Sequence, residues 1–366
     1  MLIMLATDVT VRGGVDRYVI HLTDALRRSR HSSVLVLEET TTSALRDASG
    51  AMGDLPVEYA ALYRRRHPPE RLQAAASAVL DSFRPDAVHI VCGSPLSCLT
   101  LRDEVLARGI PLVVTEQQVD DMLVVTPEER RRIRSSYRSA KRVVFVSEGN
   151  RTTMDRLVGL GQVSTEVIPN GVALAAVRAR AEGAVGPQAS GGARIMTAAR
   201  LAREKGLDVL IRAVATLPSG LVREVNIFGD GPERHSLERL VADLGEAGRV
   251  TLHPWVSDIP ELMARHHLFV LPSTAEGLPF AVLEAMAVGI PVVATDVPGS
   301  AEALAHGEAG TLVPQRDVVA LASAIASRLQ DPAGTAALAG AALQRVRAHY
   351  DLSAQMRRTV DVWEGP

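Results

Sequence analysis

The sequence lacks the residues that mark several large classes of protein. It has two cysteines among 366 residues, Cys92 and Cys98, without a C-x-x-C pair or further partners for a zinc site. We therefore expect buried, reduced thiols, as in a cytoplasmic protein. No apolar run approaches the ~18 residues that a membrane-spanning helix needs. The start, Met1–Ala6, lacks a basic leader and a cleavage site, and we expect it to form the first strand.

Net charge and lysine are scarce as well. The formal net charge is −2 at pH 7, so the chain as a whole does not attract nucleic acid or an anionic membrane. Of the 40 basic residues only Lys141 and Lys205 are lysine. Because lysine supplies a compact point charge and arginine a planar fork, these two positions indicate that a point charge is needed there.

What the sequence does contain is a long alternation of apolar runs and helical patterns, which indicates parallel sheets covered by helices. A chain of 366 residues, at about 150 residues for each domain, predicts two domains. Residues 173–193 are rich in glycine and alanine, as linkers are. We predict an α/β fold of two Rossmann-like, doubly wound domains that face each other across a cleft. They comprise residues 1–172, with the C-terminal segment 351–366 packing back, and residues 194–350.

The most informative stretch lies between two predicted strands of the second domain. His267–Pro272 and Pro291–Thr295 have the pattern of buried strands, and Phe280–Val288 that of a helix. Pro279 suits the first position of that helix. Ligands bind beyond the carboxyl ends of parallel strands, so the loop Thr274–Leu278 should face the cleft. Free N–H groups at the helix start favour an anion such as phosphate.

Two carboxylates flank this predicted helix start. Glu276 precedes it, and Glu284 follows Pro279 by about 7–8 Å at ~1.5 Å per residue. Carboxylates are poor ligands for an anion, but they accept hydrogen bonds from hydroxyls on either side of it, which ribose and a hexose would offer. The alternative is that each glutamate only complements the helix dipole.

A second group of residues follows the first predicted strand of the second domain. Arg200 and Lys205 precede a predicted helix, where positive charges oppose the helix dipole unless an anion lies between them. A diphosphate would resolve this conflict, bound by Arg200 as a fork and by Lys205 as a point charge. Salt bridges within the loop, for example to Glu204, are the structural alternative.

Other features are compatible with a functional or a structural role. Gly231 follows a strand, and Gly13 and Gly14 separate the first strand from its helix, so each could bring backbone N–H groups close to a phosphate or could form a tight turn. The arginine-rich stretches 64–71 and 128–142 are typical of solvated faces. They could also contact an anionic acceptor or a membrane surface.

Together these motifs resemble those of the retaining glycosyltransferases of family 4, which have the GT-B fold. The resemblance covers nearly the whole chain, is strongest over residues 194–315 and is weaker over residues 1–130. The stretches that carry it are Ile168–Val172, Arg200–Gly206, Phe228–Arg234, Glu276–Ala287 and Pro291–Thr295.

The resemblance implies a role for each candidate residue. Arg200 and Lys205 would hold the diphosphate of a UDP- or GDP-linked sugar donor, Glu284 the ribose hydroxyls and Glu276 the transferred sugar. The stretch His253–Val256 would lie by the base. Such enzymes retain the anomeric configuration and use no metal, so no cofactor beyond the donor co-substrate is expected. The donor would also lie against the backbone of Gly13, Gly14, Gly231, Gly277, Leu278, Pro279 and Phe280.

The sequence departs from the family at one position. Members usually carry histidine where this chain has Gln117, which can form hydrogen bonds but cannot carry charge. We therefore hypothesise an altered contact with the donor sugar. His89 ends a predicted strand of the first domain and could either line the cleft or be an ordinary core histidine.

The predicted function is transfer of a sugar to a hydroxyl-bearing acceptor that contacts first-domain loops. The acceptor could be a small natural product, a sugar or a lipid-linked envelope precursor, and peripheral membrane contact stays open. Rival functions on the same scaffold are an epimerase, a phosphorylase or a non-catalytic nucleotide-sugar binding protein. A nicotinamide oxidoreductase is disfavoured, because no G-x-G-x-x-G follows the first strand. The sequence does not indicate an oligomeric state.

Overall fold

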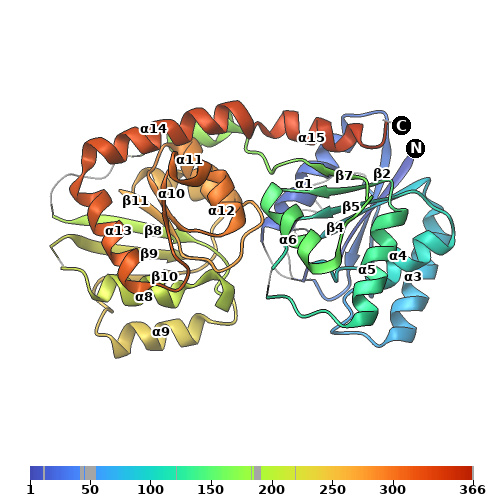
Figure 1. Ribbon diagram of the computed structural model, residues 1–366, viewed down its shortest axis with the longest axis horizontal. Coiled ribbons are helices and arrows are strands. Elements are labelled where there is room, and N and C mark those ends of the chain that lie inside the picture. Colours follow the sequence, from blue (N-terminus) through green and yellow to red (C-terminus); the bar gives the residue numbers. More distant parts are fainter. Residues whose placement is uncertain are drawn as a thin grey trace. The chain divides into compact units, whose positions relative to one another are not determined.

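The computed structural model describes residues 1–10, 13–41, 45, 55–120, 122–182, 184, 191–218 and 220–364. The chain divides into two compact units, and each contains its own parallel sheet (Figure 1). The first unit comprises Met1–Asn170 together with Ser353–Pro366, and the second comprises Gly171–Leu352.

The first unit contains a sheet of seven strands among the described residues, in the order β3-β2-β1-β4-β5-β6-β7. Each of its strand pairings is parallel. All six residues of β4 are buried, which explains why the strands appear in the sequence as continuous apolar runs. The strands are β1 (Leu2–Thr7), β2 (Ser32–Glu38), β3 (Val57–Ala60), β4 (Ala87–Cys92), β5 (Leu112–Glu116), β6 (Arg142–Phe145) and β7 (Thr165–Val167).

Helices cover both faces of the first sheet. Neighbouring helices α3, α4, α5 and α6 pack in sequence on one another, while α1 packs against β2 and β4. Helix α5 begins at a capping box, in which the Thr126 hydroxyl accepts from the Glu129 amide at 3.2 Å and the Glu129 carboxylate accepts from the Thr126 amide at 2.8 Å. These helices are α1 (Gly14–Arg27), α3 (Pro69–Phe83), α4 (Leu99–Ala107), α5 (Pro127–Ser139) and α6 (Glu148–Val158).

The C-terminal helix α15 (Leu352–Asp361) packs on the first unit. The hydroxyls of Thr359 and of Tyr18 on α1 lie 3.3 Å apart in the core. After the helix, the Trp363 carbonyl accepts a hydrogen bond of 3.2 Å from Lys141. One of the two lysines therefore attaches the end of the chain to the first unit.

The second unit contains a parallel sheet of six strands within its described residues, in the order β10-β9-β8-β11-β12-β13. The strand order reverses between β8 and β11, and in parallel sheets ligands generally bind beyond the carboxyl ends of the strands at such a reversal. The strands are β8 (Ala193–Ala198), β9 (Val222–Phe228), β10 (Val250–His253), β11 (Leu268–Leu271), β12 (Val292–Thr295) and β13 (Thr311–Val313).

The helices of the second unit form two groups. Helix α8 contacts α9 and α13, whereas α11 contacts α7, α10, α12 and α14. Seven residues of α11 are buried in this packing, and all of them except Glu284 are apolar. A helix that is apolar on nearly every side is typical of such a buried position. The elements are α7 (Leu174–Ala181), α8 (Leu207–Ala215), α9 (Arg234–Asp243), α10 (Ile259–Ala264), α11 (Phe280–Val288), α12 (Pro298–Ala303), α13 (Val318–Gln330) and α14 (Pro332–His349), with 3-10 turns η1 (Arg203–Lys205) and η2 (Ala305–Gly307).

Two local predictions need correction. Residues 174–181, inside the predicted linker 173–193, form helix α7, which packs against α10 and α11; residues 183 and 185–190 of that segment lie outside the described residues. Pro279 is the N-cap of α11 and not its first helical residue, because its ψ of 119° is still extended. The helix begins one residue later, at Phe280.

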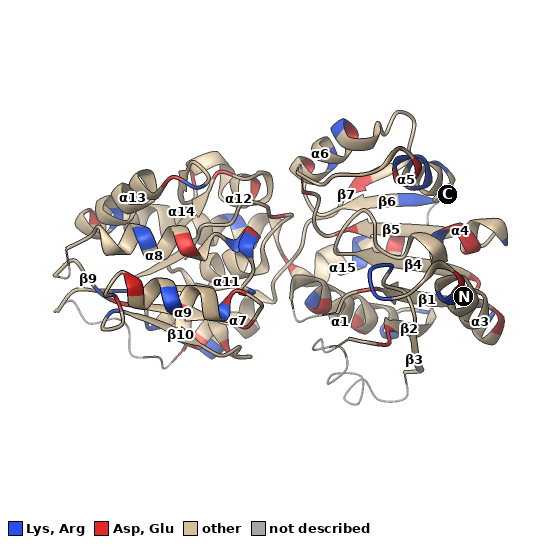
Figure 2. Cartoon of the chain, turned by 90° about the horizontal axis from the view of Figure 1, so that it is seen from below, with Lys and Arg blue, Asp and Glu red and all other residues tan. Residues whose placement is uncertain are grey.

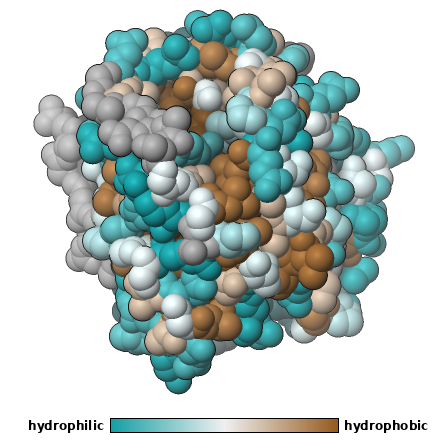
Figure 3. Space-filling view, turned by 90° about the vertical axis from the view of Figure 1, so that its left-hand side faces the viewer, coloured by the Kyte–Doolittle hydropathy of each residue, from teal (hydrophilic) through white to brown (hydrophobic). Residues whose placement is uncertain are grey.

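On the face drawn in Figure 3, brown apolar areas are separated by teal polar ones. None of the described helices is both long and apolar enough to cross a membrane.

Candidate functional site

The loops that follow β8 and β11 meet through a charged pair. The ammonium of Lys205 lies 2.7 Å from Oε1 of Glu276, and their side chains are only 13% and 9% exposed. The same oxygen accepts a hydrogen bond of 2.6 Å from the Ser273 hydroxyl. The structure thus brings two of the predicted site residues together at the point of the second sheet where the strand order reverses.

The loop that carries Lys205 is held by a close backbone approach. Gly206 has a φ of 60°, and a Cβ at this position would lie 2.1 Å from the Pro272 carbonyl oxygen. Beside it the Glu204 carbonyl accepts from the Thr274 amide at 2.7 Å and from its hydroxyl at 3.2 Å. Only glycine fits at position 206, so this residue fixes how the two loops sit on each other.

Arg200 is also paired within its loop. Its guanidinium bonds the Glu204 carboxylate and its side chain remains 40% exposed. Both cations thus have carboxylate partners, Glu204 for Arg200 and Glu276 for Lys205, which includes the salt bridge expected as the structural alternative. That a diphosphate lies between the two cations stays a prediction.

Gly231 contributes a close approach of backbone to backbone. A Cβ at Gly231 would lie 2.3 Å from the Leu201 carbonyl oxygen. The Leu201 amide donates to the Asp230 carbonyl at 2.9 Å, and the Leu201 carbonyl accepts from the Glu233 amide at 2.9 Å. In this structure the glycine therefore allows the turn after β9 to support the Arg200–Gly206 loop.

The loop before α11 is enclosed from its other side by α12. The Gly299 amide donates to the Glu276 carbonyl at 3.2 Å, and a Cβ on Gly299 would lie 2.2 Å from the Gly277 carbonyl oxygen. The Thr295 hydroxyl at the end of β12 bonds the Ser273 carbonyl. Sequence reasoning did not identify Gly299 or Thr295 as supporting residues. The available signals were a threonine at a strand end and a Pro-Gly pair opening a helix.

The start of α11 is buried together with its glutamate. Leu278 is 2% exposed and Phe280 7% exposed, and Glu284, one helical turn further on, is also 7% exposed. Burial of a carboxylate costs free energy unless polar groups bond it. Glu284 therefore differs from a surface glutamate whose only effect is to complement the helix dipole.

The stretch His253–Val256, which the resemblance places by the nucleotide base, contains the rings of His253 and Trp255. The imidazole of His253 stacks on Phe228 with 4.5 Å between ring centroids, and its Nε2 lies 2.6 Å from Oδ1 of Asn226. Burial lowers the pKa of His253. Trp255 is 42% exposed, and its amide donates to the Asp230 carboxylate at 2.9 Å.

The first unit holds the remaining candidates. Gly13 is the N-cap of α1 and Gly14 its first residue. The Gly13 amide donates to the Asp16 carboxylate at 3.2 Å, and a Cβ on Gly13 would meet no heavy atom of the described residues within 4 Å. The packing therefore does not itself require glycine at position 13.

His89 lies in the middle of β4 and does not end a strand as predicted. Its side chain is completely buried, Nε2 lies 2.8 Å from the Thr115 hydroxyl, and the ring stands edge-on to Trp363 with 5.9 Å between centroids. Burial lowers the pKa of His89 to about 3. His89 therefore lies in the core, as the alternative holds, but its Nδ1 has no hydrogen-bond partner among the described residues.

Gln117 directly follows β5 and is 6% exposed. Its backbone amide donates to the Cys92 carbonyl at 2.9 Å, while its side-chain nitrogen has no hydrogen-bond partner among the described residues. This buried donor lies at the carboxyl end of the first sheet, the edge at which parallel sheets bind ligands.

A buried charged cluster that sequence reasoning missed supports the same edge. Arg102 and Glu116 are fully buried and 3.4 Å apart, and the Tyr137 hydroxyl donates to Glu116 at 2.5 Å. Arg102 also donates to the Cys92 sulfur at 2.8 Å. Burial raises the pKa of Glu116, and the Arg102 charge opposes that rise. The only sequence signal was a charged residue at the end of an apolar strand.

Comparison with known proteins gives matches to both units. A family model described as Glycosyltransferase Family 4 matches residues 12–176, and one described as Glycosyl transferases group 1 matches residues 192–331. The α-D-kanosaminyltransferase of Streptomyces kanamyceticus is 36% identical over 163 residues, 44% of this chain and 42% of that protein. The D-inositol 3-phosphate glycosyltransferase of Pseudarthrobacter chlorophenolicus is 32% identical over 248 residues, 62% of this chain and 58% of that protein.

The structural comparison covers the full length. The crystal structure of HepE from Anabaena in complex with UDP-glucose aligns with a TM-score of 0.82 over 100% of this chain and 99% of that chain, at 22% identity. This likeness shows the predicted GT-B fold. By sequence, the matched segments span between 20% and 59% of the curated relatives' own lengths.

Proposed function

The chain belongs to glycosyltransferase family 4, and from this premise we propose that it transfers a sugar from a nucleotide diphosphate to a hydroxyl-bearing acceptor, with retention of the anomeric configuration and without a metal ion. The complex of HepE with UDP-glucose supports UDP-glucose as the first donor to test. GDP-linked sugars are the second class.

The observation that carries this proposal is the pair of Lys205 and Glu276 where the loops after β8 and β11 meet. An ammonium group has three donors, so Lys205 can keep its bond to Glu276 and still donate to diphosphate oxygens. Arg200, 40% exposed in the same loop, adds a guanidinium fork. These charges stabilise the diphosphate as it leaves the sugar.

The carboxylates then bind the hydroxyls on either side of the diphosphate. Oε1 of Glu276 already takes bonds from Lys205 and Ser273, and a carboxylate has about four acceptor sites, so capacity remains for the transferred sugar. Glu284 accepts from the ribose hydroxyls. The half-exposed ring of Trp255 offers a surface on which the base stacks.

The reaction exchanges one C–O bond for another. The bond from the anomeric carbon to the diphosphate breaks with both electrons going to the departing oxygen. The acceptor hydroxyl then bonds the anomeric carbon from the same face, and its proton passes to the departing diphosphate. Because the charge that develops lies on the diphosphate, the cations act chiefly in the transition state.

The experiment starts from the purified full chain. A thermal-shift screen of nucleotide diphosphates and their sugars identifies the donor, since a ligand that binds only the folded state raises its melting temperature. Release of the nucleotide diphosphate is then followed with and without hydroxyl acceptors, in the presence of EDTA. Acceptor-dependent release, and a product with the donor's anomeric configuration by NMR, support the proposal. Release that ignores the acceptor, or an inverted product, contradicts it.

Gln117 is proposed to contact the donor sugar in place of the usual histidine. Its side-chain amide nitrogen is buried and has no hydrogen-bond partner among the described residues. It can donate to a sugar oxygen but cannot supply a charge. The donor preference of Gln117→His is compared with that of the parent. An unchanged preference among several donor sugars would rule this role out.

A further inference from the structure

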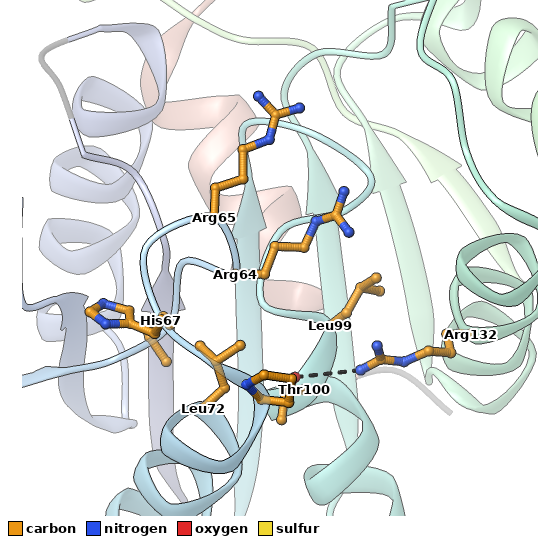
Figure 4. Close-up of a pocket in the computed structure, with 9 residues that line it drawn as sticks. Arg64, Arg65, His67, Leu72, Leu99, Thr100 and Arg132 are labelled. Atoms are coloured by element: carbon orange, nitrogen blue, oxygen red, sulfur yellow. Dashed lines mark hydrogen bonds between the residues drawn. The ribbon is translucent and has the colours of Figure 1, made fainter.

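A basic pocket lies within the first unit. It is a cavity of about 350 Å³ between the loop after β3 and the first turns of α3 and α4, with Arg132 of α5 at its side. Figure 4 shows its lining: Arg64 and Arg65 extend in the same direction from the loop, and Arg132 reaches toward Thr100. Figure 2 shows the basic residues gathered on α5.

The loop that carries two of these arginines is held in place by a buried carboxylate. Glu38, 0% exposed at the end of β2, accepts from the amides of Leu62 and Tyr63 at 2.8 and 2.7 Å. It also bonds Nε2 of His67 at 2.8 Å. Because Glu38 bonds the loop on both sides of Arg64 and Arg65, these arginines are presented by an ordered loop and not by a free chain.

The three arginines of the pocket differ in whether a carboxylate is paired with them. Arg64 pairs with Glu129, and Arg132 lies 2.7 Å from the Asp103 carboxylate. Arg65 is exposed and makes no hydrogen bond or ion pair with any described residue. Of the three guanidinium groups that line the cavity, two are paired with carboxylates, and that of Arg65 has no carboxylate partner among the described residues.

Neutral donors and an apolar floor complete the lining. Thr100, within hydrogen-bond reach of Arg132 at 3.4 Å, is the second residue of α4. That helix has no side-chain cap and no acidic residue of its own in its first turn; the amide of its N-cap Cys98 donates to the Asp8 carboxylate at 3.1 Å. Leu72 and Leu99, 5% and 4% exposed, form an apolar part of the lining.

We propose that this pocket binds the phosphate group of the acceptor, whose carbon skeleton lies on the leucine floor. Arginine forks with a nearby hydroxyl match the oxygens of a phosphate ester. This inference rests on the proposed function, because it assigns the pocket to the acceptor of that reaction. The phosphate belongs either to a small soluble ester or to a lipid headgroup, and the experiment separates these sources.

The test uses phenyl phosphate, which combines a phosphate with a small apolar ring, and calorimetric titration of the full chain. The pocket variant is Arg65→Gln with Arg132→Gln. The matched control is Arg66→Gln with Arg131→Gln, the exposed sequence neighbours, which do not line the cavity. We expect saturable binding that weakens with salt and falls by roughly tenfold or more in the pocket variant only. Equal losses in both double variants, or no saturable binding, overturn the proposal.

The diphosphate site could also bind phenyl phosphate, so the titration is repeated with Lys205→Gln. Binding that survives this change but not the pocket substitutions assigns the phosphate to the first unit, whatever the outcome of the donor experiments. Binding lost only in Lys205→Gln overturns the pocket assignment and leaves the proposed function standing. Sedimentation with phosphatidylglycerol and phosphatidylcholine vesicles identifies the source. Binding to phosphatidylglycerol vesicles but not to phosphatidylcholine vesicles, if the pocket substitutions abolish it, assigns a lipid headgroup. No pocket-dependent binding to phosphatidylglycerol vesicles assigns a soluble ester.

Discussion

The ammonium of Lys205 and the carboxylate of Glu276 lie 2.7 Å apart although 71 positions separate them in the sequence. The two loops that carry them follow β8 and β11, the neighbouring strands between which the order of the second sheet reverses. Parallel topology therefore places this pair beyond the carboxyl ends of the strands, where such sheets bind ligands. The contacts of Gly206 and Gly299 hold the two loops in register.

Gly206→Ala is expected to disrupt the site, because its Cβ would lie 2.1 Å from the Pro272 carbonyl oxygen in addition to the cost of a positive φ. Gly245→Ala is the matched control, since Gly245 has a φ of 72° but no described heavy atom within 4 Å of an added Cβ. Urea unfolding should show a loss of about 1–2 kcal/mol for the control and a clearly larger loss for Gly206→Ala. Equal losses would mean that the contact with Pro272 does not hold the loop.

Arg200→Gln is expected to reduce transfer roughly tenfold or more, because it removes one of two cations proposed to act on the departing diphosphate. Arg203→Gln changes the same charge in the same loop. Its side chain is exposed and makes no hydrogen bond or ion pair with the described residues. The measurement is kcat/KM of Arg200→Gln and of Arg203→Gln, each compared with the parent. A comparable fall in the control would indicate a general effect of loop charge.

Much of the fold followed from apolar periodicity. Strands buried on both faces and helices between them were visible in the sequence, and α11 was predicted with its observed bounds, Phe280–Val288. The predicted linker was wrong over residues 174–181, because α7 is so rich in alanine and arginine that its apolar pattern is weak. Packing against α10 and α11 decides its structure.

The candidate site was predictable only in part. Motif spacing indicated Lys205 and Glu276, but their direct pairing depends on which strands are neighbours, and sequence order does not give that. His89 was placed at a strand end because the sequence does not show where β4 stops; the strand continues to Cys92 and buries the histidine. The arginine pocket depends on Glu38 and His67, which meet only after folding.

Arg102→Met is expected to destabilise the first unit by about 3–5 kcal/mol, because it leaves the buried Glu116 without its cation. Adding Glu116→Gln to it should restore part of that loss, since no uncompensated charge then remains. A double-mutant cycle by urea unfolding measures this coupling. Additive effects of the two substitutions would show that the pair does not interact energetically.

Stability should fall in acid because of buried histidine. The pKa of His89 is lowered to about 3 by burial, whereas an unfolded imidazole titrates near 6.5, so between these values only the unfolded state takes up the proton. His21, whose burial lowers its pKa to about 4, acts in the same direction. The stabilisation is complete above about pH 6.5 and is lost as the pH falls, at up to ~1.4 kcal/mol per pH unit for each group.

The free energy of unfolding, measured by urea at several pH values between 7.5 and 4.5, checks this slope. His89→Gln should make it shallower, and substitution of the exposed His235, whose side chain is 92% exposed, should leave it unchanged. The same slope in His89→Gln as in the parent would show that this imidazole does not control acid stability.

The most direct test of the account is calorimetric titration of UDP and GDP into the parent, Lys205→Gln and Lys141→Gln. The chain has only these two lysines, and Lys141 bonds the Trp363 carbonyl in the first unit, so the second variant controls for loss of a lysine elsewhere. We expect one of the two nucleotides to bind the parent and Lys141→Gln equally well, and Lys205→Gln at least roughly tenfold more weakly. Unchanged affinity in a folded Lys205→Gln would contradict the assignment of this lysine to the donor diphosphate.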